Sequence, residues 1–291
     1  MAIFDSVAEL VQTCKDRNMP MWQAVMHFSA KETGISEELS WQKMSSRLQA
    51  MQSADRSYKP CDRSRSGLVG GDGQKIKEYF DSGKSICGGF IGEVLAGAVR
   101  MGECNACMHR IVAAPTAGSC GVIPAVLLPY AREHNVSDDE LIKALYVTAG
   151  IGSVIANRAS VSGAEAGCQA EIGSASAMAA AALVYLHGGN EEQMAHAAAI
   201  AIKNLLGLVC DPVAGLVEVP CVKRNAAGAM NALTAAELAL AGVTSRIPTD
   251  EVIDAMQIVG ESLPVALRET GKGGVAATPT ANRFKKEFFG E

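Results

Sequence analysis

The spacing of hydrophobic and polar residues predicts a chain that folds almost entirely into α-helices. Apolar residues recur three and four positions apart through most of the sequence, whereas the apolar–polar alternation of a half-buried strand is nearly absent. This periodicity predicts helices over residues 3–18, 20–28, 36–57, 74–80, 90–109, 124–132, 137–154, 169–186, 190–206, 225–241 and 249–262. The expected fold class is therefore all-α.

Polar residues at the starts of these stretches support the helix boundaries. Ser36 stands before two glutamates, and Ser137 stands three residues before Glu140, as in a capping box. Asn190 stands in the same relation to Gln193. In such patterns the first side chain accepts a hydrogen bond from a backbone N–H that the helix itself leaves unpaired.

Changes in composition divide the chain into two parts. Residues 1–57 are polar and amphipathic, whereas from Tyr58 the chain becomes rich in glycine and serine. Residues 169–186 are almost all small or apolar, and a helix that is apolar on every side is expected to be buried. We predict an N-terminal helical extension, 1–57, and one main helical domain, 58–291, because no fixed-period repeat and no low-complexity linker indicates further units.

Composition and charge narrow the class of function. Hydrophobic residues make up 48% and charged residues 20% of the 291 positions, which is typical of a globular chain. A net charge of -5 without a basic stripe argues against nucleic acid as the main partner. The first residues show no secretory signal, and no apolar run is long enough to cross a bilayer. We expect a cytoplasmic protein with neither a membrane nor a nucleic-acid partner.

The chain has nine cysteines, which in a reducing compartment are better explained by metal binding, catalysis or burial than by disulfides. Cys168, Cys210 and Cys221 stand in stretches rich in glycine and proline. Their spacing lacks the C-x-x-C pattern of ferredoxins, and free cysteine is often a small core residue, so spacing alone leaves cluster binding and burial equally open. Ligation is favoured because each cysteine stands at or beside a predicted helix end, and because Pro212 and Pro220 stiffen the segment between the last two. We predict that the three thiolates hold an iron–sulfur cluster and leave one iron open.

Two alternatives to this cluster use the cysteines differently. Cys104 and Cys107, followed by His109, suggest a helical zinc-binding, iron–sulfur or electron-transfer module, although no second cysteine pair at metal-site spacing accompanies them. A pair of thiols one helical turn apart is also compatible with simple packing. The other alternative is a noncatalytic scaffold in which all the cysteines are core residues.

Other residues are candidates for substrate binding or proton transfer. The stretches 64–67 and 118–121 offer backbone amides and hydroxyls suited to a carboxylate, although neither is a Walker A loop. Four histidines lie in ordinary helical patterns, and none stands out as a catalytic base: His27, His134, His187 and His196. Four cationic residues are better placed, near glycine-rich breaks: Lys84, Lys223, Arg224 and Lys272.

Four long motifs then point to a known family. They are S-R-S-G-L-V-G-G-D (64–72), A-P-T-A-G-S-C-G-V-I-P-A (114–125), E-A-G-C-Q-A-E-I-G-S-A (165–175) and C-D-P-V-A-G-L-V-E-V-P-C-V-K-R-N (210–225). In this order they closely resemble the iron–sulfur-dependent L-serine dehydratases, and specifically the α subunit of the two-chain form. The resemblance runs from about residue 58 to the end of the sequence.

This resemblance implies an activity and a set of site residues. It implies a [4Fe-4S] cluster on three cysteines that match Cys168, Cys210 and Cys221, and conversion of L-serine to pyruvate and ammonia without pyridoxal phosphate. The open iron would act as a Lewis acid on the substrate hydroxyl. The loop 116–121 would hold the substrate carboxylate. With the stretch 64–67, it gives the predicted substrate-binding residues Ser66, Thr116, Gly118, Ser119 and Gly121.

The sequence departs from some members of this family in two ways. Single-chain relatives carry an N-terminal β portion whose Ser-Ser-His-Thr motif resembles a source of the catalytic base, and we find no such segment here. A separate β subunit, and hence a hetero-oligomer, is therefore implied, with Lys84 and Lys272 as the remaining candidates for the base. Some relatives also cap the fourth iron with a C-terminal cysteine, whereas this sequence ends in residues 288–291, Phe-Phe-Gly-Glu. Water, substrate or the partner chain is expected to take that place.

Overall fold

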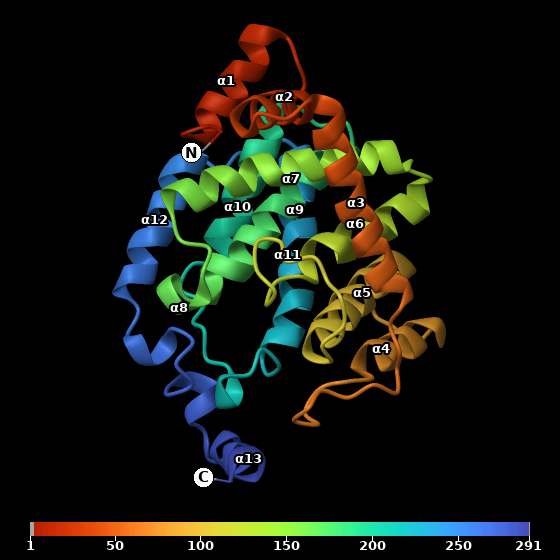
Figure 1. Cartoon of the computed structure of the whole chain (residues 1–291), viewed down its shortest axis with the longest axis vertical. Coiled ribbons are helices and arrows are strands. Elements are labelled where there is room, and N and C mark those ends of the chain that lie inside the picture. Colours follow the sequence, from red (N-terminus) through yellow and green to blue (C-terminus); the bar gives the residue numbers. More distant parts are fainter. Residues whose placement is uncertain (1–2, 291) are drawn as a thin grey trace.

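The computed structural model describes residues 3–290, and this part of the chain is built of α-helices without a β-sheet (Figure 1). The helices are α1 (Val7–Arg17), α2 (Met21–Thr33), α3 (Glu37–Arg56), α4 (Asp72–Asp81), α5 (Gly89–Ala106), α6 (Val122–His134), α7 (Asp138–Arg158), α8 (Gly163–Ala166), α9 (Ser174–Leu186), α10 (Glu191–Leu205), α11 (Cys221–Leu240), α12 (Thr249–Ser262) and α13 (Pro279–Phe289). A π-helical segment, Gln169–Gly173, precedes α9 without a break, and short 3₁₀ turns cover Val213–Gly215, Val265–Leu267 and Gly274–Ala277. The expected all-α fold class is confirmed.

The helix starts follow the polar signals in the sequence. The Ser36 hydroxyl accepts a hydrogen bond from the Leu39 N–H, and the Ser137 hydroxyl accepts one from the Glu140 N–H. At the start of α10 the capping box is complete, because the Gln193 side chain also accepts from the Asn190 N–H at 3.0 Å. These side chains pair N–H groups that have no partner inside the helix.

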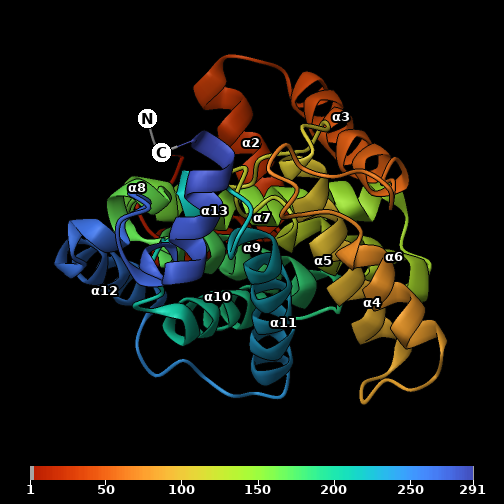
Figure 2. The same cartoon turned by 90° about the horizontal axis from the view of Figure 1, so that it is seen from below.

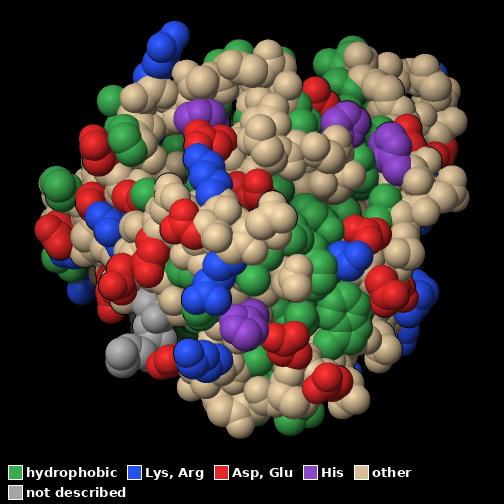
Figure 3. All heavy atoms as spheres, turned by 90° about the horizontal axis from the view of Figure 1, so that it is seen from above, with side chains coloured by type: hydrophobic (Ala, Val, Ile, Leu, Met, Phe, Trp, Pro, Cys, Tyr) green, Lys and Arg blue, Asp and Glu red, His purple; other side chains and the backbone are tan. Residues whose placement is uncertain are grey.

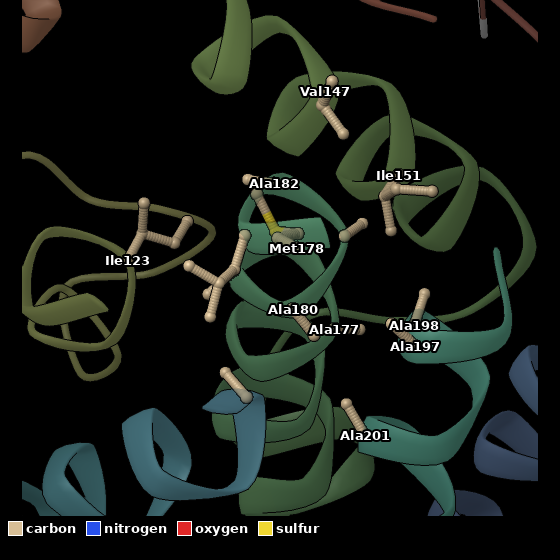
Figure 4. Close-up of a cluster of buried hydrophobic side chains, with 14 of the residues drawn as sticks. Ile123, Val147, Ile151, Ala177, Met178, Ala180, Ala182, Ala197, Ala198 and Ala201 are labelled. Atoms are coloured by element: carbon tan, nitrogen blue, oxygen red, sulfur yellow. The ribbon is translucent and has the colours of Figure 1, made fainter. Parts of the chain in front are cut away.

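Helix α9 is the centre of the molecule. It is buried on nearly its whole circumference, and α6, α7, α10 and α11 surround it. Figure 4 shows Met178 and the alanines of α9 between Ile123 of α6, Val147 and Ile151 of α7, and the alanines of α10. Because most of these contacts involve alanine, the surrounding helices approach closely, and the expected full burial of residues 169–186 is confirmed for α9 up to Val184.

The first three helices pack onto this core rather than standing apart. Leu10 of α1, Met21 of α2 and Leu48 of α3 belong to the same cluster of buried side chains as α9. Ser40 of α3 also forms a buried 2.8 Å hydrogen bond with the Tyr146 hydroxyl of α7. The division into an extension, 1–57, and a main domain, 58–291, stays a prediction.

Two short elements near the C-terminal half differ from the sequence expectations. From the sequence we expected only a glycine-rich tail after residue 262, but α13 forms there. It lies at the lower end of the molecule in Figure 1 and therefore faces the viewer in Figure 2, which shows the molecule from below. Its single buried residue is Ala281, so it contributes little to the core. Helix α8 is one turn long and was not expected either.

The surface carries both signs of charge. On the face seen in Figure 3 acidic and basic side chains are interspersed, without a continuous basic stripe. Among the helices of residues 3–290, none combines the length and the apolar character needed to cross a membrane.

Candidate active site

The three cysteines of the predicted cluster site come from three separate elements and lie near one another. Cys168 directly precedes the π-helical segment, Cys221 is the first residue of α11, and Cys210 lies in the loop after α10. All three are buried, with exposed fractions of 2%, 7% and 2%, respectively. Their proximity is evident from their electrostatics, because the charge of Cys168 raises the pKa of both other thiols.

The backbone around Cys210 differs from the expectation of a helix end. Helix α10 ends at Leu205, and Cys210 is instead fixed in an extended bridge with Arg268. Its N–H donates to the Leu267 carbonyl at 2.9 Å, and its carbonyl accepts from the Glu269 N–H at 2.7 Å. A pairing between distant segments thus holds this thiol, which local sequence signals do not reveal.

Burial makes these thiols poor acids. It raises the pKa of Cys168 and of Cys221 to about 12, and it raises that of Cys210 further, with the neighbouring Cys168 and Glu171 adding to the effect. The guanidinium of Arg224, which hydrogen-bonds Cys168, acts in the opposite direction on the pKa of that thiol. Three buried thiols of this kind become thiolates only beside a further positive group, which is the behaviour of a metal-ligating set.

Arg224 ties the segments that carry the cysteines together. Its guanidinium donates to the Val209 carbonyl at 2.7 Å and to the buried Asp211 carboxylate at 2.8 Å. Asp211 in turn accepts from the Val275 N–H at 2.7 Å. A Cβ on Gly274, where φ is +59°, would lie 2.3 Å from Asp211 Oδ2, so only glycine fits there.

The loop 116–121, predicted to bind the substrate carboxylate, lies against the same end of α11. The Asn225 side chain donates to the Gly118 carbonyl at 2.8 Å and to the Cys221 carbonyl at 3.0 Å, and it accepts from the Gly121 N–H at 2.8 Å. The amide of Gly121 is therefore engaged within the protein. Asn225 fixes the loop beside Cys221.

The hydroxyls of this loop contact each other. The Thr116 and Ser119 hydroxyls are 3.1 Å apart, and the Thr116 N–H points at the Ser119 hydroxyl at 3.4 Å. Among the described residues, the Ala117, Gly118 and Ser119 N–H groups have no hydrogen-bond acceptor. These amides are the unpaired backbone donors of the loop.

Ser66 lies on a second loop, which is attached to the segment between Cys210 and Cys221. The hydroxyls of Ser64 and Ser66 both donate to the Glu218 carboxylate, the former at 2.8 Å. A small cavity of about 190 Å³ separates Ser66 from Phe284 and Phe288 of α13. A larger cavity of about 580 Å³, between α1 and α10, contains none of the predicted site residues.

Glu171 is a site residue that the sequence analysis did not single out. It lies in the π-helical segment three residues after Cys168, and Thr116 hydrogen-bonds its carboxylate. A Cβ on Gly163 would be 2.8 Å from Glu171 Oε2 and 2.9 Å from Cys210 Sγ, so the carboxylate and the thiol border the same small space. The signal in the sequence that could have indicated Glu171 is its place inside the motif around Cys168. Its π-helical segment is a second indication, because π-helical turns are frequent at functional sites.

The two lysines proposed as bases differ in position. Lys272 is exposed, next to Gly271, whose backbone packs against Gly215 in the segment between the last two cysteines. Lys84 is exposed in the loop after α4, and only its backbone hydrogen bonds are observed among the described residues. Lys223 forms an ion pair with Asp72 at 3.2 Å.

Four of the five histidines, and Cys104, have contacts away from this group of residues. His27 pairs with Glu37, His134 and His187 flank Tyr130, and His109 pairs with Asp62 at 2.9 Å. Cys104 is buried, with its sulfur 3.9 Å from the Ala54 carbonyl, and burial raises its pKa to about 11. These are the contacts of packed side chains.

The donor set can be compared with the needs of a metal group. Within residues 3–290, no three His, Cys, Asp or Glu side chains are arranged to hold a single metal ion. A polynuclear cluster spreads its thiolate ligands over several irons. Three buried thiols beside Arg224, with glycine at position 163 leaving space next to Cys210, fit such a cluster.

Comparison with known proteins identifies the family. A family model described as "Serine dehydratase alpha chain" matches residues 16–276. The chain belongs to this serine dehydratase alpha-chain family. It is 49% identical, over 99% of its own length and 96% of the relative's, to a Bacillus subtilis protein named as a probable L-serine dehydratase alpha chain. It is 43% identical, over 99% of both chains, to the L-serine dehydratase alpha chain of Peptoniphilus asaccharolyticus.

Longer relatives match about two thirds of this chain with part of their own length. The L-serine dehydratase of Haemophilus influenzae is 44% identical over 187 residues, which is 64% of this chain but 41% of the relative. The resemblance expected from the four motifs is therefore confirmed, and it extends into the N-terminal helices as well.

Proposed function

We propose that the chain is the alpha subunit of an L-serine dehydratase, a lyase that converts L-serine to pyruvate and ammonia. The observation that carries this proposal is the alignment, over nearly the whole chain, with relatives named as L-serine dehydratase alpha chains. The site supports it, because three buried thiols, a loop with open amides and a buried carboxylate meet at one place.

Cys168, Cys210 and Cys221 are proposed to hold a [4Fe-4S] cluster. When bound by three thiolates, such a cluster supplies an open iron as a Lewis acid for a leaving hydroxyl group. Arg224 supports the thiolates by its positive charge and keeps the loop of Cys210 attached to α11. No pyridoxal phosphate is needed for this chemistry.

The protein residues are proposed to bind and orient the substrate. The carboxylate of L-serine would accept hydrogen bonds from the Gly118 and Ser119 amides, with Thr116 and Ser66 at the border of the site and Gly121 as the anchor of the loop. Loss of the α-proton to a base and of the β-hydroxyl as water gives aminoacrylate. This product tautomerises to an imine, and water hydrolyses the imine to pyruvate and ammonia.

The base is proposed to come from a partner subunit. The name alpha chain, carried by the two full-length relatives, implies a second chain. Within the described residues, the candidates Lys84 and Lys272 are both exposed, and Lys272 is the nearer to the cysteine loop. A β subunit that covers this end of the molecule would complete the site.

Replacing the cysteines one at a time tests the cluster. Anaerobic reconstitution with iron and sulfide should give the broad visible absorbance of an iron–sulfur protein in the wild type. Cys168→Ser, Cys210→Ser and Cys221→Ser should each lose that absorbance, because a missing thiolate leaves an iron without its ligand. Cys104→Ser is the control and should keep it. Absorbance that survives in the first three variants and disappears in the control would refute this assignment.

The activity has its own measurement. Pyruvate formed from L-serine is followed for the reconstituted chain with and without its β partner. We expect formation only, or mainly, in the mixture. A mixture that carries the full complement of iron and sulfide but forms no pyruvate contradicts the proposed function.

A further inference from the structure

Glu171 places its carboxyl group beside the cysteines without an ion-pair partner. Within residues 3–290 its carboxylate forms no salt bridge, and its polar contact is with Thr116. The guanidinium of Arg224 is the cation that affects it, but that group is already bonded to Asp211 and to the Val209 carbonyl. A largely buried carboxylate is costly unless an opposite charge meets it.

The position of this carboxylate relates it to both predicted halves of the site. A Cβ on Gly118 would lie 3.3 Å from Glu171 Oε1, and one on Gly163 would lie 2.8 Å from Oε2. The first glycine belongs to the loop proposed for the substrate carboxylate, and the second also faces Cys210. Glu171 therefore stands between the loop and the cysteines, with a glycine close to each of its two oxygens.

The other carboxylates near the three cysteines either have hydrogen-bond partners or are more exposed to solvent. Asp211 is held by Arg224 and the Val275 N–H, and Glu218 is held by Ser64 and Ser66. Glu269 is only partly buried, and its charge adds to the effect of burial in raising the pKa of Glu171. An entering cation would relieve the repulsion that Glu171 experiences.

L-Serine brings such a cation. In the proposed function its carboxylate is assigned to the loop amides and its hydroxyl to the leaving-group position, which leaves its α-ammonium group unassigned. We propose that Glu171 accepts a hydrogen bond from the α-ammonium group of the substrate and makes the site specific for 2-amino acids over 2-hydroxy acids. This inference rests on the proposed function and adds a specificity-determining residue to it.

The test compares ligands that differ at that group. L-Glycerate carries a hydroxyl where L-serine carries its ammonium, and L-alanine keeps the ammonium but has no hydroxyl to lose. For Glu171→Gln in the reconstituted complex, the KM for L-serine should rise about 10- to 100-fold, the range expected for losing one hydrogen bond between charged groups. The inhibition constant of L-glycerate should stay within about twofold, because that ligand has no ammonium to lose.

Two further measurements separate this role from damage to the site. Calorimetry of L-alanine binding should show the same loss of affinity as L-serine, without any reaction. The iron–sulfur absorbance of Glu171→Gln should equal that of the wild type. Glu269→Gln is the matched control for a nearby negative charge, and it should leave the KM for L-serine unchanged.

The outcomes are distinct. An unchanged KM for L-serine in Glu171→Gln overturns the inference, and so does a parallel weakening of L-serine and L-glycerate. Loss of the iron–sulfur absorbance would assign Glu171 to the cluster and also overturn it. A wild-type complex without any activity on L-serine would instead overturn the proposed function, and the inference with it.

Discussion

Single side chains join the parts of this site, and Asn225 does so most directly. It bonds the Gly118 carbonyl, the Gly121 N–H and the Cys221 carbonyl, so one amide group connects the substrate loop to a proposed cluster ligand. The residue is 1% exposed, so these bonds are shielded from solvent. A buried N–H that loses its acceptor costs about 1–3 kcal/mol.

Asn225→Ala should therefore impair substrate binding. We expect kcat/KM for L-serine to fall about 10- to 100-fold, mainly through KM, because the loop amides lose their fixed positions. Steady-state kinetics of the reconstituted complex measures this fall. Asn231→Ala is the control, since Asn231 donates partly buried hydrogen bonds from the same helix to the Ser176 hydroxyl and the Ala201 carbonyl. Equal losses of kcat/KM in both variants would show that Asn225 serves stability alone.

Among the individual residues of the candidate site, the three cysteines were predicted from the sequence and Glu171 was not. The cysteines stand in recognisable motifs, whereas the environment of Glu171 depends on two glycines, Gly118 and Gly163, that are 53 and 8 residues away in the chain. A glutamate in a helical pattern is normally exposed. Only the folded arrangement reveals that this one is enclosed beside thiols.

Helix α4 depends on a capping group that comes from another helix. Glu103 of α5 is 2% exposed and accepts hydrogen bonds from the Asp72 N–H at 2.7 Å, the Gly73 N–H at 3.2 Å and the Tyr58 hydroxyl at 2.7 Å. It thereby holds both ends of the loop that contains Ser66. Carboxylates at a helix N-terminus also interact favourably with the helix dipole.

Glu103→Gln should loosen that loop. We expect the free energy of unfolding to fall by about 1–3 kcal/mol, since charge-assisted bonds to buried N–H groups are lost. Urea unfolding followed by circular dichroism gives the number. Glu93→Gln, on the same helix but in exposed ion pairs with Lys77 and Arg100, should cost about 1 kcal/mol or less. A larger cost for Glu93→Gln than for Glu103→Gln would contradict the capping role.

Most of the helices were predictable from the sequence, but α8 and α13 were missed. The helices that surround α9 have apolar faces, and α7 and α10 also begin at polar caps, so their positions follow from the sequence. Helix α13 has one buried residue and follows the glycines at 271, 273 and 274, which conceal it. The π-helical segment is set by packing between α9, α10 and α11, for which no local signal exists.

At the level of the whole molecule, the N-terminal helices pack closely against the core at a glycine of α7. A Cβ on Gly150 of α7 would lie 2.5 Å from Val25 Cγ2 of α2, whereas one on Gly152 would lie 2.8 Å from the terminal methyl of Met178 in α9. Valine is stiff at its branched carbon, and methionine has three rotatable bonds. The same substitution thus meets a rigid neighbour at one position and a flexible one at the other.

Alanine substitutions at Gly150 and Gly152 test whether residues 1–57 unfold together with the rest of the chain. Gly150→Ala should lower the free energy of unfolding by about 1–3 kcal/mol through overpacking. Gly152→Ala should be nearly neutral, because the gain in helix propensity of about 1 kcal/mol offsets the displacement of Met178. Calorimetry should show a single transition that shifts as a whole in Gly150→Ala. A separate early transition would assign residues 1–57 to an independent unit.

The π-helical segment after Cys168 has a consequence for the length of the chain at this point. One residue turns an α-helix by about 100°, and α9 is enclosed on all sides and has no freedom to turn. The wider π-helical turn of residues 169–173 therefore determines where Cys168 and Glu171 stand relative to α9. Deletion or insertion of one residue there would rotate the cysteine away from its two counterparts.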